Sequence, residues 1–204
     1  MNEASVIVSR PVRPEALVLL FHGVGSTADN LVPLGELAAR ERAHAMVVSV
    51  SAPHPSTPGA GREWFSVIGV TEQGRPDRVR DAMPSFLEVV SMWQAEAGVD
   101  ASRTTLVGFS QGAIMALEAT QVADLSGRVV SLSGRFAQLP RRAPDGVVFR
   151  FVHGAVDPVI DPRFSVQSAQ TLRALGADAT VQLLPGLAHG IDARAARLAM
   201  EALA

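Results

Sequence analysis

Short apolar runs rich in β-branched residues alternate along this chain with longer stretches in which apolar residues recur at helical spacing. Strands that are apolar at almost every residue are typical of a sheet that helices cover on both faces. Regular alternation of strand and helix implies right-handed crossovers and a mostly parallel sheet. We expect strands at residues 6–8, 16–21, 45–50, 104–109, 128–132, 147–152 and 179–183, the first as an antiparallel edge strand. We expect helices at residues 30–42, 75–96, 111–122, 162–175 and 192–203. The sequence therefore predicts an α/β fold.

The length and composition fit a single globular domain. The chain has 204 residues, of which 48% are hydrophobic and 19% charged, so it can bury a core without disulfides or metals. No repeat or low-complexity tract marks a linker, and we expect one domain over residues 1–204. Met83-Pro84 indicates a kink or a late start of the second helix. Two Pro- and Gly-containing loops, at residues 51–74 and 133–146, interrupt the alternation, and loops at strand ends of such a sheet usually hold the ligand.

Charge and cysteine content exclude several classes of protein. The formal net charge is −2, whereas binding to nucleic acid needs a basic face, so we expect no nucleic acid partner. The absence of cysteine excludes disulfides, thiolate metal sites and a cysteine nucleophile. No basic leader precedes the first apolar run, and no apolar run approaches the roughly 20 residues that cross a bilayer. We therefore expect a soluble cytoplasmic protein without a membrane partner.

The segment Gly108-Phe109-Ser110-Gln111-Gly112 matches the G-x-S-x-G pattern of a nucleophile elbow. The pattern alone is weak, because it should occur by chance in about one in fifteen chains of this length. Here it follows an expected strand and opens an expected helix, which is the context that the elbow of an α/β-hydrolase requires. The alternative is an ordinary serine that caps the helix. We favour Ser110 as the nucleophile of a serine hydrolase with the α/β-hydrolase fold.

A glycine-containing loop, His22-Gly23-Val24-Gly25, follows the strand expected at residues 16–21. In this fold a backbone N–H of that loop and the N–H after the nucleophile together bind the developing oxyanion. We assign these donors to Val24 and Gln111, with the glycines allowing close approach of the backbone. A phosphate-binding loop is the weaker interpretation, because the required lysine and glycine spacing are missing. We interpret His22 as a structural histidine.

Two of the five histidines, His153 and His189, follow Ser110 in the chain. The elbow predicts the order serine, acid, histidine, with the histidine in the loop after the last strand. His189 has that position, whereas His153 stands at the end of the strand expected at residues 147–152, where the acid should follow. We therefore favour His189 as the general base.

An aspartate between the nucleophile and the base should orient the histidine. The candidates are Asp124, Asp145, Asp157, Asp161 and Asp178. Asp157 comes a few residues after the strand expected at residues 147–152, the usual place for the acid. Asp161 precedes Pro162 and is expected to cap a helix, as is Asp192 before the last helix. We therefore favour Asp157 as the third member of the triad.

With these motifs in place, the chain resembles the carboxylesterase/phospholipase family that includes the acyl-protein thioesterases, and in particular a bacterial esterase branch. The resemblance covers nearly the whole chain. The matching segments are residues 20–25 (LFHGVG), 61–66 (GREWFS), 108–115 (GFSQGAIM), 153–154 (HG), 157–160 (DPVI) and His189. The apolar loop of the acyl-protein thioesterases is not clearly reproduced here.

The resemblance implies hydrolysis of carboxylic esters or thioesters by the triad and oxyanion donors assigned above, with no metal and no organic cofactor. It also implies that Trp64 and Phe65 line the groove for the acyl group, although core packing explains these aromatic residues equally well. We expect Gly23, Trp64 and Phe65 to contact a small-molecule ester or thioester. Because no segment is long enough for a separate cap domain, we expect small to medium acyl groups. A small peptidase or lactonase with the same triad, and a non-catalytic binding module on this fold, are the alternatives.

Overall fold

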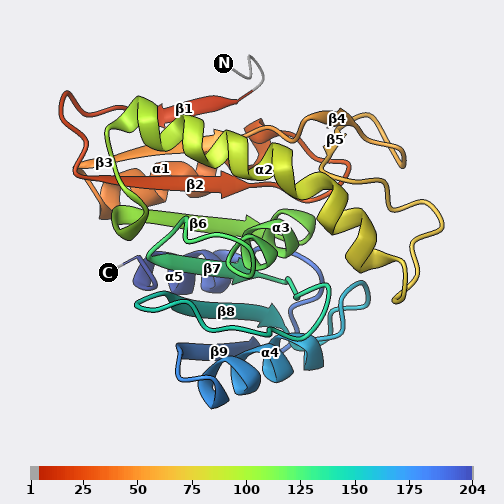
Figure 1. The fold of residues 1–204 in the computed structure, drawn as a ribbon. Helices are drawn as coiled ribbons and strands as arrows, with labels where there is room; N and C mark the ends of the chain where they lie inside the picture. Colours follow the sequence, from red (N-terminus) through yellow and green to blue (C-terminus); the bar gives the residue numbers. More distant parts are fainter. Residues whose placement is uncertain (1–4, 204) are drawn as a thin grey trace.

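The computed structural model describes residues 5–203, and its centre is a seven-stranded sheet (Figure 1). The strands lie in the order β1-β3-β2-β6-β7-β8-β9. They are β1 (Val6–Ser9), β2 (Ala16–Phe21), β3 (Ala45–Val50), β6 (Thr104–Phe109), β7 (Arg128–Leu132), β8 (Val148–Gly154) and β9 (Asp178–Leu184). Every neighbouring pair is parallel except β1 and β3, which are antiparallel. The mostly parallel sheet with an antiparallel edge strand is therefore confirmed.

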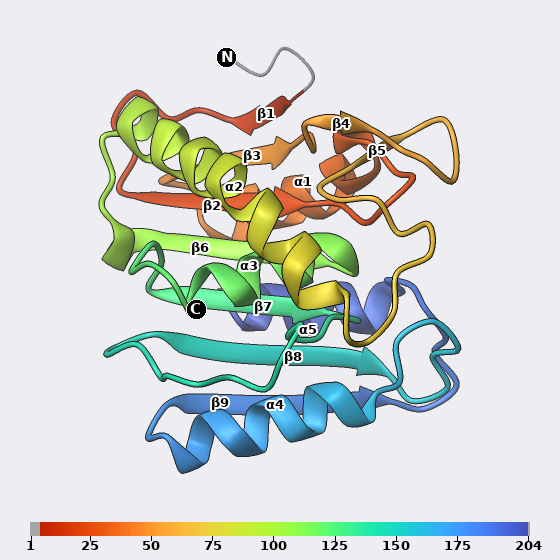
Figure 2. The same cartoon turned by 45° about the vertical axis from the view of Figure 1, so that its right-hand side comes forward.

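Helices cover both faces of this sheet. The helices are α1 (Val32–Glu41), α2 (Arg75–Ala97), α3 (Gln111–Ala119), α4 (Arg163–Ala174) and α5 (Ala193–Glu201). One face carries α2, α3 and α4, and the opposite face carries α1 and α5 (Figures 1 and 2). Short elements complete the described chain: two 3-10 helices, η1 (Ala28–Leu31) and η2 (Ala101–Arg103), and a two-stranded ribbon, β4 (His54–Pro55) and β5 (Arg62–Glu63).

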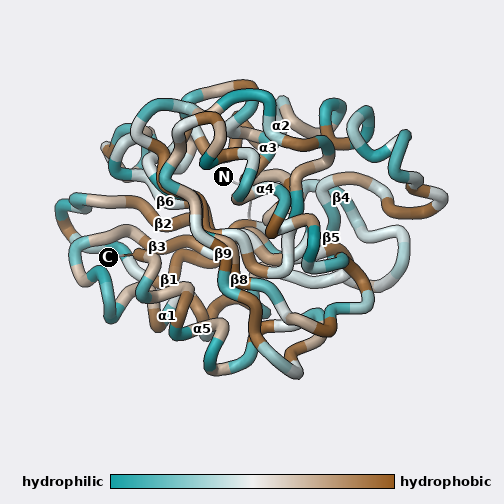
Figure 3. Tube along the Cα trace, turned by 90° about the horizontal axis from the view of Figure 1, so that it is seen from below, coloured by the Kyte–Doolittle hydropathy of each residue, from teal (hydrophilic) through white to brown (hydrophobic). Residues whose placement is uncertain are grey.

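Successive residues of the central strands enter two separate cores. In β2, Leu17, Leu19 and Phe21 belong to the core under α2, α3 and α4. Val18 and Leu20, which alternate with them, belong to the core under α1 and α5. Side chains of a strand point alternately to opposite faces, so a strand that is buried on both faces needs an apolar residue at each position. The hydrophobic colouring of the inner strands in Figure 3 follows this pattern.

The helix α2 runs without interruption through Pro84. Of the two alternatives at Met83-Pro84, the late start is wrong, since the helix begins at Arg75, and a kink stays a prediction. Proline lacks one N–H and costs the helix a hydrogen bond. Val79 and Phe86, on either side of Pro84, are buried against the sheet, and this packing outweighs the local cost. The start of α2 has its own local signal, since Pro76 lies in the first turn of the helix.

The parallel strands direct all their carboxyl ends to the same edge of the sheet (Figure 2). The loops that follow β2, β6, β8 and β9 carry Val24, Ser110, Asp157 and His189 respectively. Segments that are distant in sequence therefore meet at one edge, as expected for a ligand site in an open α/β sheet. In residues 5–203, no helix is both long and apolar enough to span a bilayer.

Candidate active site

Ser110 occupies the turn between β6 and α3 in a strained conformation, with φ of 53° and ψ of −114°. Close packing explains the flanking glycines. A Cβ atom on Gly108 would lie 2.4 Å from the backbone of Ala113, and one on Gly112 would lie 2.2 Å from the carbonyl oxygen of Phe21. The Ser110 side chain makes no capping hydrogen bond to α3, so the alternative of a helix-capping serine is excluded. A non-glycine residue with positive φ is typical of a functional position.

The structure brings together the three residues that the sequence predicts as nucleophile, base and acid. Ser110 Oγ lies 2.9 Å from His189 Nε2, and His189 Nδ1 lies 2.7 Å from Asp157 Oδ2. Ser110 and the carboxylate of Asp157 are buried, whereas the imidazole of His189 keeps a small exposed surface. The three side chains form a continuous path of hydrogen bonds.

The carboxylate of Asp157 is fixed from both of its oxygens. Oδ1 accepts hydrogen bonds from the N–H groups of Val159 (2.8 Å) and Ile160 (3.0 Å), while Oδ2 faces His189. Burial raises the pKa of Asp157, but the hydrogen bonds from His189, Ile160 and Val159 outweigh burial, and the pKa is lowered from its ordinary value. Asp157 therefore carries a negative charge at neutral pH in a fixed orientation.

His153 is a second histidine on the same carboxylate, and the sequence did not predict this contact. Its Nε2 lies 3.1 Å from Asp157 Oδ2 and 2.9 Å from the carbonyl oxygen of Ile160, and its Nδ1 lies 2.7 Å from Ser165 Oγ. Both neighbours of Nε2 are acceptors, so this nitrogen donates. Burial lowers the pKa of His153, which keeps the ring neutral. The spacing of four residues between His153 and Asp157 was the only local signal of the contact.

The structural interpretation of His22 is confirmed. Its ring is 1% exposed; Nδ1 donates to the carbonyl oxygen of Gly23 at 2.7 Å, and Nε2 accepts from the N–H of Ala52 at 3.1 Å. Burial lowers the pKa of His22, so it is neutral and holds two loops together. His22 has no part in the path from Ser110 to Asp157.

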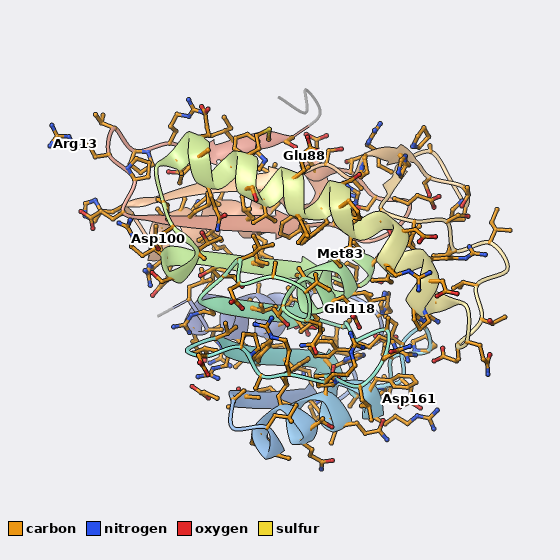
Figure 4. The ribbon with its side chains drawn as sticks, viewed as in Figure 1. Arg13, Met83, Glu88, Asp100, Glu118 and Asp161 are labelled. Carbon is orange, nitrogen blue, oxygen red and sulfur yellow. The ribbon has the colours of Figure 1, made fainter. Side chains whose placement is uncertain are left out.

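The N-cap role of Asp192 is confirmed, whereas the N-cap of α4 is Pro162 and Asp161 lies one residue before it. Asp161 accepts a hydrogen bond from the N–H of Arg163 at 2.9 Å, at the start of α4 (Figure 4). Asp192 is the N-cap of α5 and accepts from the N–H of Ala195 at 2.9 Å. Both carboxylates satisfy backbone donors that a helix N-terminus leaves free.

Val24 and Gln111 stand beside Ser110 in the wall of one cavity, as oxyanion donors should. Gln111 is the first residue of α3, where a helix leaves its N–H groups unpaired. In residues 5–203 neither the N–H of Val24 nor that of Gln111 donates to another protein group. A Cβ atom on Gly23 would lie 3.2 Å from the Cβ atom of Ser110, so the chain passes close to Ser110 there. Contact of Gly23 with substrate stays a prediction.

The two aromatic residues of the first long loop have different positions. Phe65 lines the cavity beside Ser110. Trp64 is absent from this wall; it is 1% exposed, and its ring centroid lies 4.9 Å from that of Phe86 in the core. The Gln111 side chain connects this loop to the elbow, because it accepts from the N–H of Trp64 at 2.8 Å and donates to the carbonyl oxygen of Phe65 at 2.7 Å. The position of Trp64 agrees with core packing and not with contact to substrate.

The cavity beside Ser110 has a volume of about 600 Å³. Its wall combines apolar residues such as Val67 and Ile114 with the arginines Arg75, Arg135 and Arg163. In the described part of the chain, no group of three or more histidine, aspartate or glutamate side chains has a geometry that could hold a metal ion. The wall thus presents the hydroxyl of Ser110, the backbone of Val24 and Gln111, and three guanidinium groups to one small ligand.

Comparison with known proteins places the chain among ester hydrolases. The profile of the Phospholipase/Carboxylesterase family matches residues 2–204. Esterase YpfH of Escherichia coli is 42% identical over 208 residues, which cover 100% of this chain and 88% of that protein. Acyl-protein thioesterase 1 of Neurospora crassa is 24% identical over 207 residues, covering 90% of this chain and 84% of that protein.

Among solved structures, that of esterase PE8 superposes with a TM-score of 0.84 and 26% sequence identity, over 93% of this chain and 91% of that one. The α/β-hydrolase fold predicted from the sequence is thereby confirmed. Since the family profile spans nearly the whole sequence and one relative is 42% identical over the full length of this chain, the chain belongs to the phospholipase/carboxylesterase family.

Proposed function

We propose that this protein hydrolyses carboxylic esters and thioesters with small to medium acyl groups, through an acyl-enzyme on Ser110. One observation carries the proposal: the hydrogen-bond path from Ser110 Oγ to His189 Nε2 (2.9 Å) and from His189 Nδ1 to Asp157 Oδ2 (2.7 Å), at the wall of a cavity. Such a path activates the hydroxyl of serine hydrolases. The names of the esterase and thioesterase relatives support the same chemistry.

In the first half of the reaction, Ser110 Oγ attacks the carbonyl carbon of the substrate while His189 Nε2 takes the hydroxyl proton. The carbonyl oxygen becomes an oxyanion, and the N–H groups of Val24 and Gln111 donate to it. The bond to the leaving oxygen or sulfur then breaks, and His189 gives its proton to the departing alcohol or thiol. The acyl group remains as an ester on Ser110.

In the second half, a water molecule attacks this ester while His189 takes one of its protons. The bond between Ser110 Oγ and the acyl carbon breaks, Oγ recovers the proton from His189, and the carboxylic acid leaves. Asp157 keeps the proton of the neutral imidazole on Nδ1 and stabilises the imidazolium that forms in each half. His153 positions Asp157 through its contact with Oδ2 and does not touch the substrate.

A panel of p-nitrophenyl esters of increasing acyl length tests this proposal, with an acyl-CoA thioester, a lactone and a peptide as comparison substrates. We expect hydrolysis of esters and thioesters, a decline of kcat/KM for long acyl chains, and loss of roughly 10⁴-fold or more in kcat in the Ser110→Ala variant. Full activity of a folded Ser110→Ala variant would contradict the proposal. Exclusive turnover of the lactone or the peptide would contradict the substrate class.

A further inference from the structure

Three arginines that are distant in sequence meet in the wall of the cavity that contains Ser110. Arg75 is the first residue of α2, Arg163 is the first residue of α4, and Arg135 follows β7. The guanidinium carbon of Arg135 lies 3.5 Å from the ring centroid of Phe164, and that of Arg163 lies 5.2 Å from the same centroid. The catalytic path described above uses none of these side chains.

Three carboxylates, Glu72, Asp157 and Asp161, line the same cavity, but only Glu72 and Asp161 form ion pairs with the three arginines. Glu72 alone serves two of the arginines: its Oε1 accepts from Arg75 Nη2 at 2.9 Å and from Arg135 Nη1 at 3.1 Å, and its Oε2 lies 2.8 Å from Arg135 Nη2. Arg163 has its own partner, since its Nε lies 3.3 Å from Asp161 Oδ2. The carboxylate of Asp157 is already held by two histidines and two backbone N–H groups. One cation of the Arg75–Arg135 pair therefore lacks a counterion of its own.

Arg75 also has a donor that no protein group uses. Its Nε is buried and, within residues 5–203, has no hydrogen-bond partner. A buried donor on a charged group that stays unpaired is costly, so such donors normally have a partner. A guanidinium in a cavity wall binds a carboxylate through parallel hydrogen bonds, as Arg135 binds Glu72 here. An anion bound in the cavity would supply the counterion that the Arg75–Arg135 pair lacks.

We propose that Arg75, together with Arg135 and Arg163, binds a carboxylate carried by the substrate. The natural substrates are then esters or thioesters whose acyl or alcohol part bears a negative charge a few bonds from the scissile carbonyl, because the cavity measures only about 600 Å³. This inference rests on the proposed function, in which Ser110 attacks an ester bound in the same cavity. Phe65, Val67 and Ile114 contribute the apolar wall that packs against the carbon chain between the two groups.

Matched pairs of substrates that differ only in charge test this inference. For the acyl side, the monoanionic p-nitrophenyl ester of adipic acid is compared with p-nitrophenyl methyl adipate. For the alcohol side, 4-acetoxybenzoate is compared with its methyl ester. We expect kcat/KM of the anion to exceed that of the neutral partner by about tenfold in at least one pair, the size of one charge-assisted hydrogen bond. The pair that shows it tells which part of the substrate carries the carboxylate.

Variants of the same helix separate this role from a general effect of charge. Arg75→Gln should remove most of the preference for the anion, and Arg75→Lys should retain part of it. Arg80→Gln is the matched control, because Arg80 is on α2, is exposed and pairs with Asp77 outside the cavity. The control should leave both rates and the preference unchanged. Arg163→Gln should also lower the preference for the anion, and it replaces Arg75→Gln as the test variant if Arg75→Gln does not fold.

Two outcomes would overturn the inference. The first is that neither pair shows any preference for the anion. The second is that the preference persists unchanged in the folded Arg75→Gln variant, or in Arg163→Gln if Arg75→Gln does not fold. Either outcome leaves the proposed esterase activity intact, provided that the neutral esters are still hydrolysed and that this hydrolysis still needs Ser110. Failure of the proposed function would instead abolish the turnover of both members of each pair.

Discussion

The Nε2 atom of His153 lies 3.1 Å from Asp157 Oδ2, the same oxygen that lies 2.7 Å from Nδ1 of His189. Two imidazoles therefore share one carboxylate oxygen: the ring of His153 is buried and neutral, and the ring of His189 is partly exposed. Oδ1 is held separately by backbone N–H groups. Asp157 cannot rotate without breaking hydrogen bonds on both oxygens. The orientation of His189 therefore depends in part on His153, which contacts Asp157 and not the substrate.

Replacement of His153 by alanine should lower kcat by about 10–100-fold, because a hydrogen bond to a charged group contributes roughly 1.5–3 kcal/mol. KM should change little, since His153 does not line the cavity beside Ser110. Steady-state kinetics on a neutral p-nitrophenyl ester measure both constants. His44→Ala, an exposed histidine, is the control and should behave as wild type. A folded His153→Ala variant with unchanged kcat would show that the backbone N–H groups hold Asp157 alone.

Asp157 and Asp161 are short carboxylates in the same loop, and substitution distinguishes their roles. Asp157→Asn should keep the shape of the site but leave His189 in the wrong tautomer, so kcat should fall by up to ~10⁴-fold. Asp161→Ala should lose the hydrogen bond to the N–H of Arg163 and about 1 kcal/mol of stability, with kcat for a neutral ester within a few-fold of wild type. Asp192→Ala, which removes the cap of α5, is the matched stability control. If Asp161→Ala abolishes turnover and Asp157→Asn does not, the acid has been assigned to the wrong residue.

The adjacent aromatic residues Trp64 and Phe65 should respond differently to truncation. Trp64→Ala removes a ring packed against Phe21 and Phe86, so the free energy of unfolding should fall by about 3–5 kcal/mol. Phe65→Ala opens the cavity wall and should shift the preference among acyl lengths. Urea denaturation and the panel of esters measure the two effects. An unchanged acyl-length profile in Phe65→Ala would exclude this residue from the acyl site.

Glu118 of α3 is a buried carboxylate that accepts hydrogen bonds from the N–H groups of Ala137 (2.7 Å) and Gln138 (3.3 Å). Burial raises its pKa, and these hydrogen bonds and the charges of Arg141 and Arg135 only partly oppose the rise. A carboxyl group whose pKa is raised by folding contributes most to stability below the pKa of the unfolded chain, about 4.3 for glutamate. That contribution is lost as the pH rises through the raised pKa of the folded protein.

Glu118→Gln keeps the acceptor oxygen and cannot lose stability in this way. We therefore expect the Tm of the variant minus the Tm of wild type to increase as the pH rises from about 4 to about 7. Thermal unfolding followed by circular dichroism at several pH values measures the difference. Glu88→Gln, on the exposed side of α2, should show no such trend (Figure 4). A difference in Tm that narrows with rising pH would contradict the sign of this effect.

Features that depend on local sequence could be predicted. The strand and turn around Ser110 carry their own signals, because the glycines at 108 and 112 are needed wherever β6, α3 and the end of β2 meet this closely. The parallel sheet then places the loops after β8 and β9 beside Ser110, which is why the aspartate and the histidine could be identified from their order in the chain. The hydrogen bonds that Asp161 and Asp192 accept at the starts of α4 and α5 are local in the same sense.

Features that depend on packing between distant segments could not be predicted. His153 reaches Asp157 only because the loop after β8 folds back over the strand end. Trp64 and Phe65 are adjacent aromatic residues, and nothing in the sequence distinguishes them. Only the fold places Trp64 in the core and Phe65 in the cavity wall. The cations of the wall come from the starts of α2 and α4 and from the loop after β7, and no pattern in the sequence connects Arg75 with Arg135.

Covalent labelling of Ser110 by a fluorophosphonate probe tests the central claim most directly. We predict that the intact mass of the protein rises by one adduct and that tryptic mapping finds it in the peptide of residues 104–128, which also contains Ser126. Fragment spectra should place the adduct on Ser110. The Ser110→Ala variant should take up no probe, and His189→Ala should label far more slowly because the hydroxyl keeps its proton. Labelling at Ser126 or any other serine, or undiminished labelling of Ser110→Ala, would contradict the account.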